Sequence, residues 1–189
     1  MILPHRARRR DPIRVALTGA NGGYGRTFLA QLAHTPEILP AILIDPDIDG
    51  VLRMLAELGI PAHRAAGSID PAHTAEIVAD GRIALIASVD ALDWAGIDVL
   101  IEACGRVGVG AAYAEAALNH NTHVVMVSKE VDTVVGVELS ARAASKGSAI
   151  SPATATSPPT CCASSTGSVR SGWTSWQSAR QGVRPPIQP

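Results

Sequence analysis

The segment LTGANGGYGRTFL, from Leu17 to Leu29, constrains the fold of this chain more than any other feature. Four glycines fall within seven residues, directly after a short apolar run and directly before a pattern typical of an amphipathic helix. Three of them, Gly19, Gly22 and Gly25, have the spacing G-x-x-G-x-x-G. A glycine loop between a strand and a helix is either a binding loop for a dinucleotide or a purely structural turn.

The three spaced glycines have distinct predicted roles in a dinucleotide loop. Gly19 permits the tight turn, Gly22 keeps a side chain out of the path of a pyrophosphate, and Gly25 lets the helix pack close to the strand. The N-terminus of the helix offers unpaired N–H groups and a partial positive charge to the anion. A nucleoside triphosphate loop is excluded, because no Gly-Lys-Ser/Thr follows at the required spacing. The cofactor-binding residues predicted in this loop are Gly19, Asn21, Gly22, Gly23, Tyr24 and Gly25.

An acidic residue ends the second predicted strand, AILID, from Ala41 to Asp45. Asp45 lies 20 residues after Gly25, where a carboxylate can accept both ribose hydroxyl hydrogens of NAD and repel the extra phosphate of NADP. Arg26 and Arg53 are the nearby cations that could reverse this preference. The sequence therefore predicts NAD or NADP as the cofactor, with NAD favoured by Asp45.

Predicted strands and helices alternate along the chain. Apolar runs at 13–18, 41–45, 97–105 and 123–128 are typical of strands buried in a parallel sheet. From Gly59 to Trp94 the pattern is harder to interpret, with a helix at 72–80 and either a strand or a buried connector at 83–89. The alternation predicts a doubly wound α/β sheet of the Rossmann type. The apolar stripes that mark the other helices are Tyr24, Phe28, Leu29 and Leu32; Val51, Leu52, Leu55 and Leu58; Val109, Ala112, Tyr113, Ala116 and Ala117; and Val134, Val137, Ala141 and Ala144.

Charge and cysteine content exclude several classes of function. The formal net charge is -1, so we expect neither nucleic-acid nor membrane binding, and no apolar run reaches the roughly 20 residues of a membrane span. The three cysteines form no disulfide framework or zinc motif, and the histidines are scattered, so we expect no metal site. These features predict a cytoplasmic protein. They leave its oligomeric state open, a homo-oligomer included.

Composition divides the chain into three parts. Residues 1–12 form a basic leader; a twin-arginine export signal is disfavoured because Ile13 to Leu17 runs straight into the glycine loop, with no long apolar stretch or cleavage site. Residues 13–150 form the predicted dinucleotide-binding domain. Residues 151–189 contain no leucine and no acidic residue, and their Ser, Thr and Pro content is typical of an irregular, disordered tail.

A frameshift near Ile150 is the alternative explanation of the tail. With suitably chosen codons, moving back one nucleotide turns Ala155 to Arg180 into GDQPPNLLRLVDWVRSLGLDVVAIGK, which has the pattern of an amphipathic helix followed by a strand. Resequencing the native DNA distinguishes the two explanations, because an unambiguous in-frame Ser-Pro-Ala-Thr rejects the frameshift.

Two families share features with the glycine loop. TGANGGYG resembles the TGxxGxxG opening of short-chain dehydrogenases, but neither Tyr24 nor Tyr113 is followed by the lysine of their Tyr-x-x-x-Lys pair. DVLIEACG, from Asp98 to Gly105, resembles a strand end of homoserine dehydrogenases and related oxidoreductases, and VVMVSKE is similar to their next strand. Over residues 13–150 the chain is most similar to the homoserine dehydrogenase-like proteins with a C-terminal SAF domain, a group that includes a reductoisomerase-like enzyme.

The resemblance implies an NAD(P)-dependent oxidoreductase and points to residues that follow two strands. Ala103, Cys104 and Gly105 are expected to pass beneath the nicotinamide ribose. Cys104 is either a nucleophile or a small buried apolar residue. The second alternative is favoured, because no histidine is predicted near it. Lys129 either donates a hydrogen bond to a substrate carbonyl as the catalytic residue or is a solvated lysine paired with Glu130.

The predicted function is hydride transfer between nicotinamide and a small polar carbonyl or hydroxyl compound. The substrate and SAF domains of the resembled group are absent from the sequence, so we expect this chain alone to be inactive. Two alternatives stay open: a non-catalytic dinucleotide-binding module and an inactive truncated product. Glu102 is expected either to cap a neighbouring helix or to touch ribose.

Overall fold

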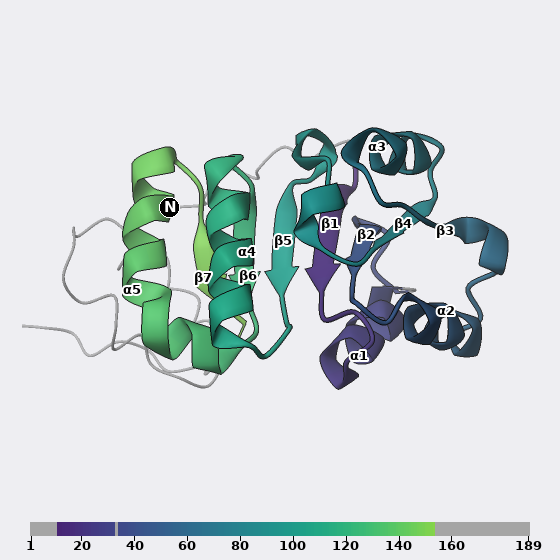
Figure 1. Ribbon diagram of the computed structural model, residues 1–189, viewed down its shortest axis with the longest axis horizontal. Coiled ribbons are helices and arrows are strands. Elements are labelled where there is room, and N and C mark those ends of the chain that lie inside the picture. Colours follow the sequence, from purple (N-terminus) through teal and green to yellow (C-terminus); the bar gives the residue numbers. More distant parts are fainter. Residues whose placement is uncertain (1–10, 33, 154–189) are drawn as a thin grey trace, which may run out of the picture. The chain divides into compact units, whose positions relative to one another are not determined.

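The computed structural model describes residues 11–32 and 34–153, which lie in one compact unit. Its strands and α-helices alternate as predicted (Figure 1), except between β4 and β5, which are joined by 3-10 turns without an α-helix. The strands are β1 (Ile13–Thr18), β2 (Ile38–Ile44), β3 (Ala65–Gly67), β4 (Ile83–Ile86), β5 (Val99–Glu102), β6 (His123–Met126) and β7 (Ile150–Pro152). The α-helices are α1 (Gly23–Leu32), α2 (Ile48–Glu57), α3 (Pro71–Ala79), α4 (Val107–Asn119) and α5 (Lys129–Lys146), with short 3-10 turns at Ala62–Arg64, Val89–Ala91 and Trp94–Gly96.

All seven strands form one parallel sheet in the order β3-β4-β2-β1-β5-β6-β7. The chain builds outward from β1 on one side through β2, and then returns to add β5 on the other side of β1. The carboxyl ends of β1 and β5 therefore flank a topological switch point, where open α/β sheets bind their ligands. This topology confirms the predicted doubly wound α/β fold.

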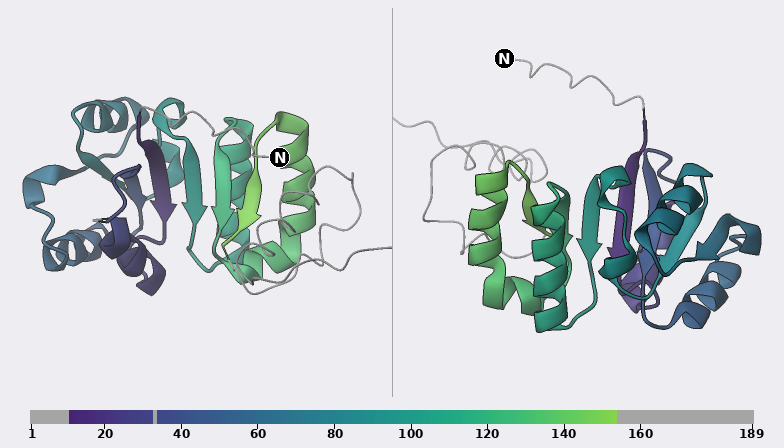
Figure 2. Two further views of the ribbon diagram at one scale, coloured as in Figure 1. Left: turned by 180° about the vertical axis from the view of Figure 1, so that it is seen from behind. Right: turned by 45° about the horizontal axis from the view of Figure 1, so that its top comes forward.

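Helices cover both faces of the sheet and separate the core into two layers. On one face, α3, α4 and α5 pack on the strands through residues such as Ile77, Leu118 and Leu139. On the other face, α1 and α2 pack on β1 and β2 through Leu29 and Met54. The two views of Figure 2 show these layers on opposite sides of the sheet. The inner strands β1, β2, β4 and β5 are largely buried, and their sequences are mostly apolar rather than alternating, as expected of strands covered on both faces.

In α2, α4 and α5, part of the predicted apolar stripe lies on the exposed face of the helix. Val134 and Val137 of α5 are 66% and 61% exposed, and the residues that face the sheet are Val131, Leu139 and Ala143. The stripe of Val134, Val137, Ala141 and Ala144 therefore identified the helix but marked the wrong face. Leu52 of α2 and Ala112 of α4 are also exposed, whereas Met54 and Ala114 are buried. Within the described ranges, no helix has the length and apolar character needed to cross a membrane.

Short strands account for most of what the sequence pattern missed. The open stretch from Gly59 to Trp94 contains α3 and β4, so 83–86 is a strand, and it also contains the unpredicted strand β3. β7 is a second unpredicted strand, whose residues pair with Val124, Val125 and Met126 of β6. The predicted leader up to residue 10, and the tail and its alternative reading frame from residue 154, lie outside the described residues.

Candidate functional site

Gly19 occupies the switch point and leaves no space for a side chain. Its φ of +64° lies in the left-handed region, and a Cβ built on it would come within 2.4 Å of the carbonyl oxygen of Ala103. Ala103 directly follows β5, so the glycine loop and the loop after β5 are in van der Waals contact at this point. Only glycine meets both requirements, which agrees with the tight turn predicted there.

The rest of the glycine loop leads directly into α1. The N–H of Gly22 donates to the carbonyl oxygen of Gly19 at 3.0 Å, which closes the turn. A Cβ on Gly25 would lie 2.2 Å from the carbonyl oxygen of Ala20, so this glycine lets the first turn of α1 pack against the loop. A Cβ on Gly23 would meet no atom within 4 Å. The first turn of α1 carries no acidic residue, and its N–H groups have no partner within the helix, so this end of α1 suits an anion.

Asp45 connects the glycine loop to the turn after β2. Its Oδ2 accepts the N–H of Asn21 at 3.0 Å, and its Oδ1 accepts the N–H of Asp47 at 3.0 Å. The side chain is half-buried, and each oxygen keeps a further lone pair for a ligand hydroxyl. Asp45 therefore lies directly after β2 and holds the glycine loop in place.

Asp47 extends this network and was not predicted from the sequence. Its Oδ1 accepts the N–H of Gly50 at 2.9 Å and caps α2, while its Oδ2 accepts the Asn21 side-chain amide at 3.0 Å. Arg53 lies 3.8 Å from the Asp47 carboxylate, and Arg26 forms an ion pair with Glu57. Both arginines that could attract a 2′-phosphate are thus already paired with carboxylates. An Asp three residues before a glycine, at the start of a helical pattern, is the N-cap signal that could have identified Asp47.

The loop after β5 is held by three side chains. Three consecutive backbone N–H groups donate to side-chain oxygens, and each of the three hydrogen bonds is 2.9 Å long. They run from Ala103 to Thr18 Oγ1, from Cys104 to Glu102 Oε1 and from Gly105 to Ser128 Oγ. The acceptors come from the ends of β1 and β5 and from the residue before α5, so three segments of the sheet edge converge on this loop.

Glu102 points into the protein rather than toward a ligand. Its side chain is fully buried, and its Oε2 has no hydrogen-bond partner among the described residues. A Cβ on Gly110 of α4 would lie 2.7 Å from the other carboxyl oxygen, so Gly110 makes room for this carboxyl group. The expectation that Glu102 caps a neighbouring helix or touches ribose is therefore wrong.

Cys104 is a protonated thiol at neutral pH. Burial, followed by its hydrogen bond with Glu102, raises the pKa of the Cys104 thiol to about 11. The side chain is only partly exposed, and its Sγ lies 3.8 Å from the carbonyl oxygen of Arg106. Because the thiolate is the nucleophilic form, these surroundings argue against a catalytic role for Cys104.

Lys129 is the first residue of α5, at the same edge of the sheet as the loop after β5. Ser128, directly before it, accepts the N–H of Gly105, so Lys129 lies next to this loop. Among the residues that the structure describes, Lys129 and Glu130 form no ion pair, and both are exposed.

Tyr24 lies near the glycine loop, in the first turn of α1, where its ring stacks on Phe28 with centroids 6.2 Å apart.

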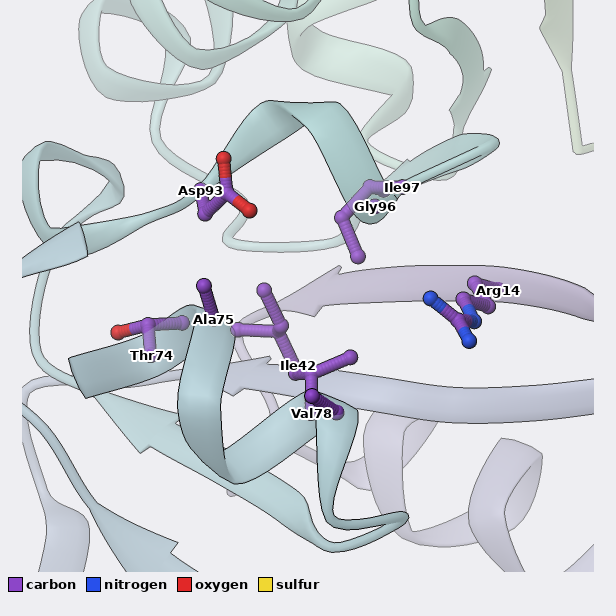
Figure 3. Close-up of a pocket in the computed structure, with 9 residues that line it drawn as sticks. Arg14, Ile42, Thr74, Ala75, Val78, Asp93, Gly96 and Ile97 are labelled. Carbon is purple, nitrogen blue, oxygen red and sulfur yellow. The ribbon is translucent and has the colours of Figure 1, made fainter. Parts of the chain in front are cut away.

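Two hollows lie away from the glycine loop. A cavity of about 70 Å³ is lined by residues that include Arg14, Ile42, Thr74 and Ile97, as Figure 3 shows. Arg14 is near the start of β1, whereas the glycine loop follows its end. Since ligand sites commonly measure about 300–1,000 Å³, this cavity is too small for a dinucleotide. The second hollow measures about 330 Å³ and includes Trp94, whose ring stacks on His120 with centroids 5.3 Å apart.

The chain is similar in sequence to one class of enzyme. No protein-family model matches it. It shares 32% identity over 150 residues with a 1-deoxy-D-xylulose 5-phosphate reductoisomerase of Jannaschia sp. (strain CCS1). The match covers 74% of this chain and 36% of the relative, so the chain spans about a third of the relative's length.

Solved structures with a similar fold are oxidoreductases. An oxidoreductase from Klebsiella pneumoniae matches with a TM-score of 0.54 and 25% identity over 76% of this chain and 35% of that chain. The Zymomonas mobilis 1-deoxy-D-xylulose 5-phosphate reductoisomerase, in complex with NADPH, matches with a TM-score of 0.52 and 20% identity, over 75% of this chain and 39% of its own. The WlbA dehydrogenase from Chromobacterium violaceum, in complex with NADH and UDP-GlcNAcA, matches with a TM-score of 0.54 and 17% identity, over 80% and 37%. The fold is thus one that dinucleotide-binding oxidoreductases use.

Proposed function

We propose that residues 13–150 bind NAD or NADP as the Rossmann domain of an oxidoreductase. The observation that carries this proposal is the position of the glycine loop at the switch point, between the α1 N-terminus and the Asp45 carboxylate. The first N–H groups of α1, from Gly23 onward, would receive the diphosphate, which would pass close to Gly22, with Asn21 and Tyr24 beside it. The cofactors in the NADPH and NADH complexes of the similar folds support the same ligand class.

The charges around Asp45 favour NAD over NADP. A 2′-phosphate would approach the carboxylates of Asp45 and Asp47, and the ion pairs of Arg26 and Arg53 partly neutralise the cations that could balance it. The ribose hydroxyls of NAD, by contrast, can donate to the free lone pairs of Asp45. We therefore expect the chain to bind NADH more tightly than NADPH.

The proposed reaction is hydride transfer to or from a small polar compound that carries carbonyl or hydroxyl groups. The bound nicotinamide supplies the hydride acceptor or donor. Ala103, Cys104 and Gly105 would lie beneath its ribose, and the exposed ammonium of Lys129 would donate a hydrogen bond to the substrate oxygen. The substrate in the name of the Jannaschia relative belongs to this class of compounds. The homoserine dehydrogenase-like resemblance indicates the same chemistry.

Isothermal titration calorimetry with NADH on the full chain tests the proposal. Gly22 has an ordinary φ, and a Cβ on it would meet only the Gly19 carbonyl oxygen, at 3.1 Å, so Gly22→Val should fold and yet obstruct the diphosphate. We expect its affinity for NADH to fall at least about tenfold, or about 1.4 kcal/mol. Gly67→Val on the edge strand β3, where a Cβ meets nothing within 4 Å, is the control and should bind normally. Unchanged affinity in Gly22→Val contradicts the proposal.

A direct spectrophotometric assay of NADH oxidation distinguishes an oxidoreductase from a non-catalytic dinucleotide-binding module. Binding without turnover on any carbonyl compound, also after the downstream reading frame has been restored, supports a non-catalytic dinucleotide-binding module. Turnover that Lys129→Ala reduces, while NADH affinity is retained, supports the proposed catalytic role of Lys129.

A further inference from the structure

The loop after β5 differs from the glycine loop in what it can offer a ligand. Its three N–H groups, from Ala103 to Gly105, are all bonded to side chains. The carbonyl oxygen of Ala103 packs against Gly19, and among the described residues no backbone N–H outside the regular helices and strands donates to the carbonyl oxygens of Cys104 or Gly105. The backbone groups left to a ligand are therefore acceptors. They suit ribose hydroxyls and the NH₂ of a carboxamide, and they do not suit a phosphate.

Two of the three acceptor side chains come from other parts of the sheet. Thr18 is fully buried at the end of β1; its Oγ1 accepts the N–H of Ala103 and lies 3.4 Å from the carbonyl oxygen of Ile101, to which it can donate. Ser128 is 5% exposed, and its Oγ accepts the N–H of Gly105, whose φ is +69°. The two hydroxyls therefore hold the loop from two sides, one at the end of β1 and one in the turn between β6 and α5.

We propose that Thr18 and Ser128 are positioning residues for the nicotinamide riboside half of the dinucleotide. By taking up the N–H groups at both ends of the loop, they keep the carbonyl groups of Cys104 and Gly105 in the one conformation that can accept hydrogen bonds from this half. Without either hydroxyl, the freed N–H allows other loop conformations, and the apparent affinity falls with the fraction of competent molecules. This inference rests on the proposed function, and it adds a role for two side chains that do not themselves touch the ligand.

The test compares two ligands on matched variants of the full chain. NADH carries the nicotinamide riboside half, whereas ADP carries only the part expected at the glycine loop and Asp45. Thr18→Val keeps the shape of the side chain and removes the acceptor, and Thr18→Ser keeps the hydroxyl. Ser128→Ala is a second, independent variant, which keeps the inference testable where Thr18→Val fails to fold. A thermal melt of each variant accompanies the titrations.

We expect Thr18→Val and Ser128→Ala to bind NADH roughly three- to tenfold more weakly and to bind ADP within about twofold of the unmodified chain. Thr18→Ser should restore the NADH affinity. An unchanged NADH affinity overturns the inference, and so does an equal loss for NADH and ADP, because a general structural role would weaken both. If the unmodified chain binds neither ligand, the proposed function itself fails, and the inference fails with it.

Discussion

Replacing Gly19 by alanine tests whether the switch point has the geometry described above. The Gly19→Ala substitution is destabilising for two reasons: the backbone keeps a left-handed φ of +64°, and the new Cβ lies 2.4 Å from the Ala103 carbonyl oxygen. The left-handed conformation costs about 1–2 kcal/mol and the overlap about 1–3 kcal/mol, which together give about 2–5 kcal/mol. Against the 5–15 kcal/mol by which domains are typically stable, this loss should be easy to measure.

Gly59→Ala is the matched control, because it separates the two penalties. Gly59 has a similar φ of +75°, but a Cβ there meets nothing within 4 Å. Gly59→Ala should therefore lower the unfolding free energy only by the conformational cost of about 1–2 kcal/mol. Thermal and urea unfolding of the three proteins give the comparison, and we expect Gly19→Ala to melt roughly 4 °C or more below the unmodified chain. Equal stabilities of Gly19→Ala and Gly59→Ala would refute the close approach of the Gly19 and Ala103 loops.

Three further predictions concern other parts of the domain. Asp45→Asn weakens the two N–H bonds from Asn21 and Asp47 and removes a charge, so calorimetry should show the preference for NADH over NADPH shrinking by roughly tenfold. The pKa of Cys104 is raised to about 11, so its alkylation, followed by mass spectrometry of its peptide, should be slow at neutral pH and accelerate up to that pH; rapid labelling at neutral pH contradicts the prediction. Val134→Ser on the exposed face of α5 should change the unfolding free energy by less than about 0.5 kcal/mol, whereas Leu139→Ala at a buried position should lower it by about 2–5 kcal/mol. The reverse order would show that α5 packs on the sheet through the face that contains Val134.

The features predicted correctly are those with a local cause. The turn at Gly19, the buried strand before it and the end of the second strand next to Asp45 follow from neighbouring residues, because glycine spacing and an apolar run act within one strand, loop and helix. The helix at 129–146 was likewise detected from its apolar spacing. Its face was wrong because it carries two apolar stripes, and a helical period does not tell which of them meets the sheet.

The features missed depend on residues that are distant in the sequence. Thr18 lies 85 residues from Ala103, and Ser128 lies 23 residues from Gly105, so no local pattern pairs them. In the sequence, Glu102 has the pattern of a surface carboxylate at a strand end. In the structure it is buried, because α4 places Gly110 against it. β3 and β7, of three residues each, are too short to show a pattern, and they exist because they pair with β4 and β6.

The central claim is that the first N–H groups of α1 receive the diphosphate of a nicotinamide dinucleotide. Amide chemical-shift mapping by NMR during a titration with NADH tests it most directly. We expect the largest shifts from Gly22 to Arg26, with a second group from Ala103 to Gly105. Shifts confined to the hollow at Trp94 and His120, or no saturable shifts at all, would contradict it.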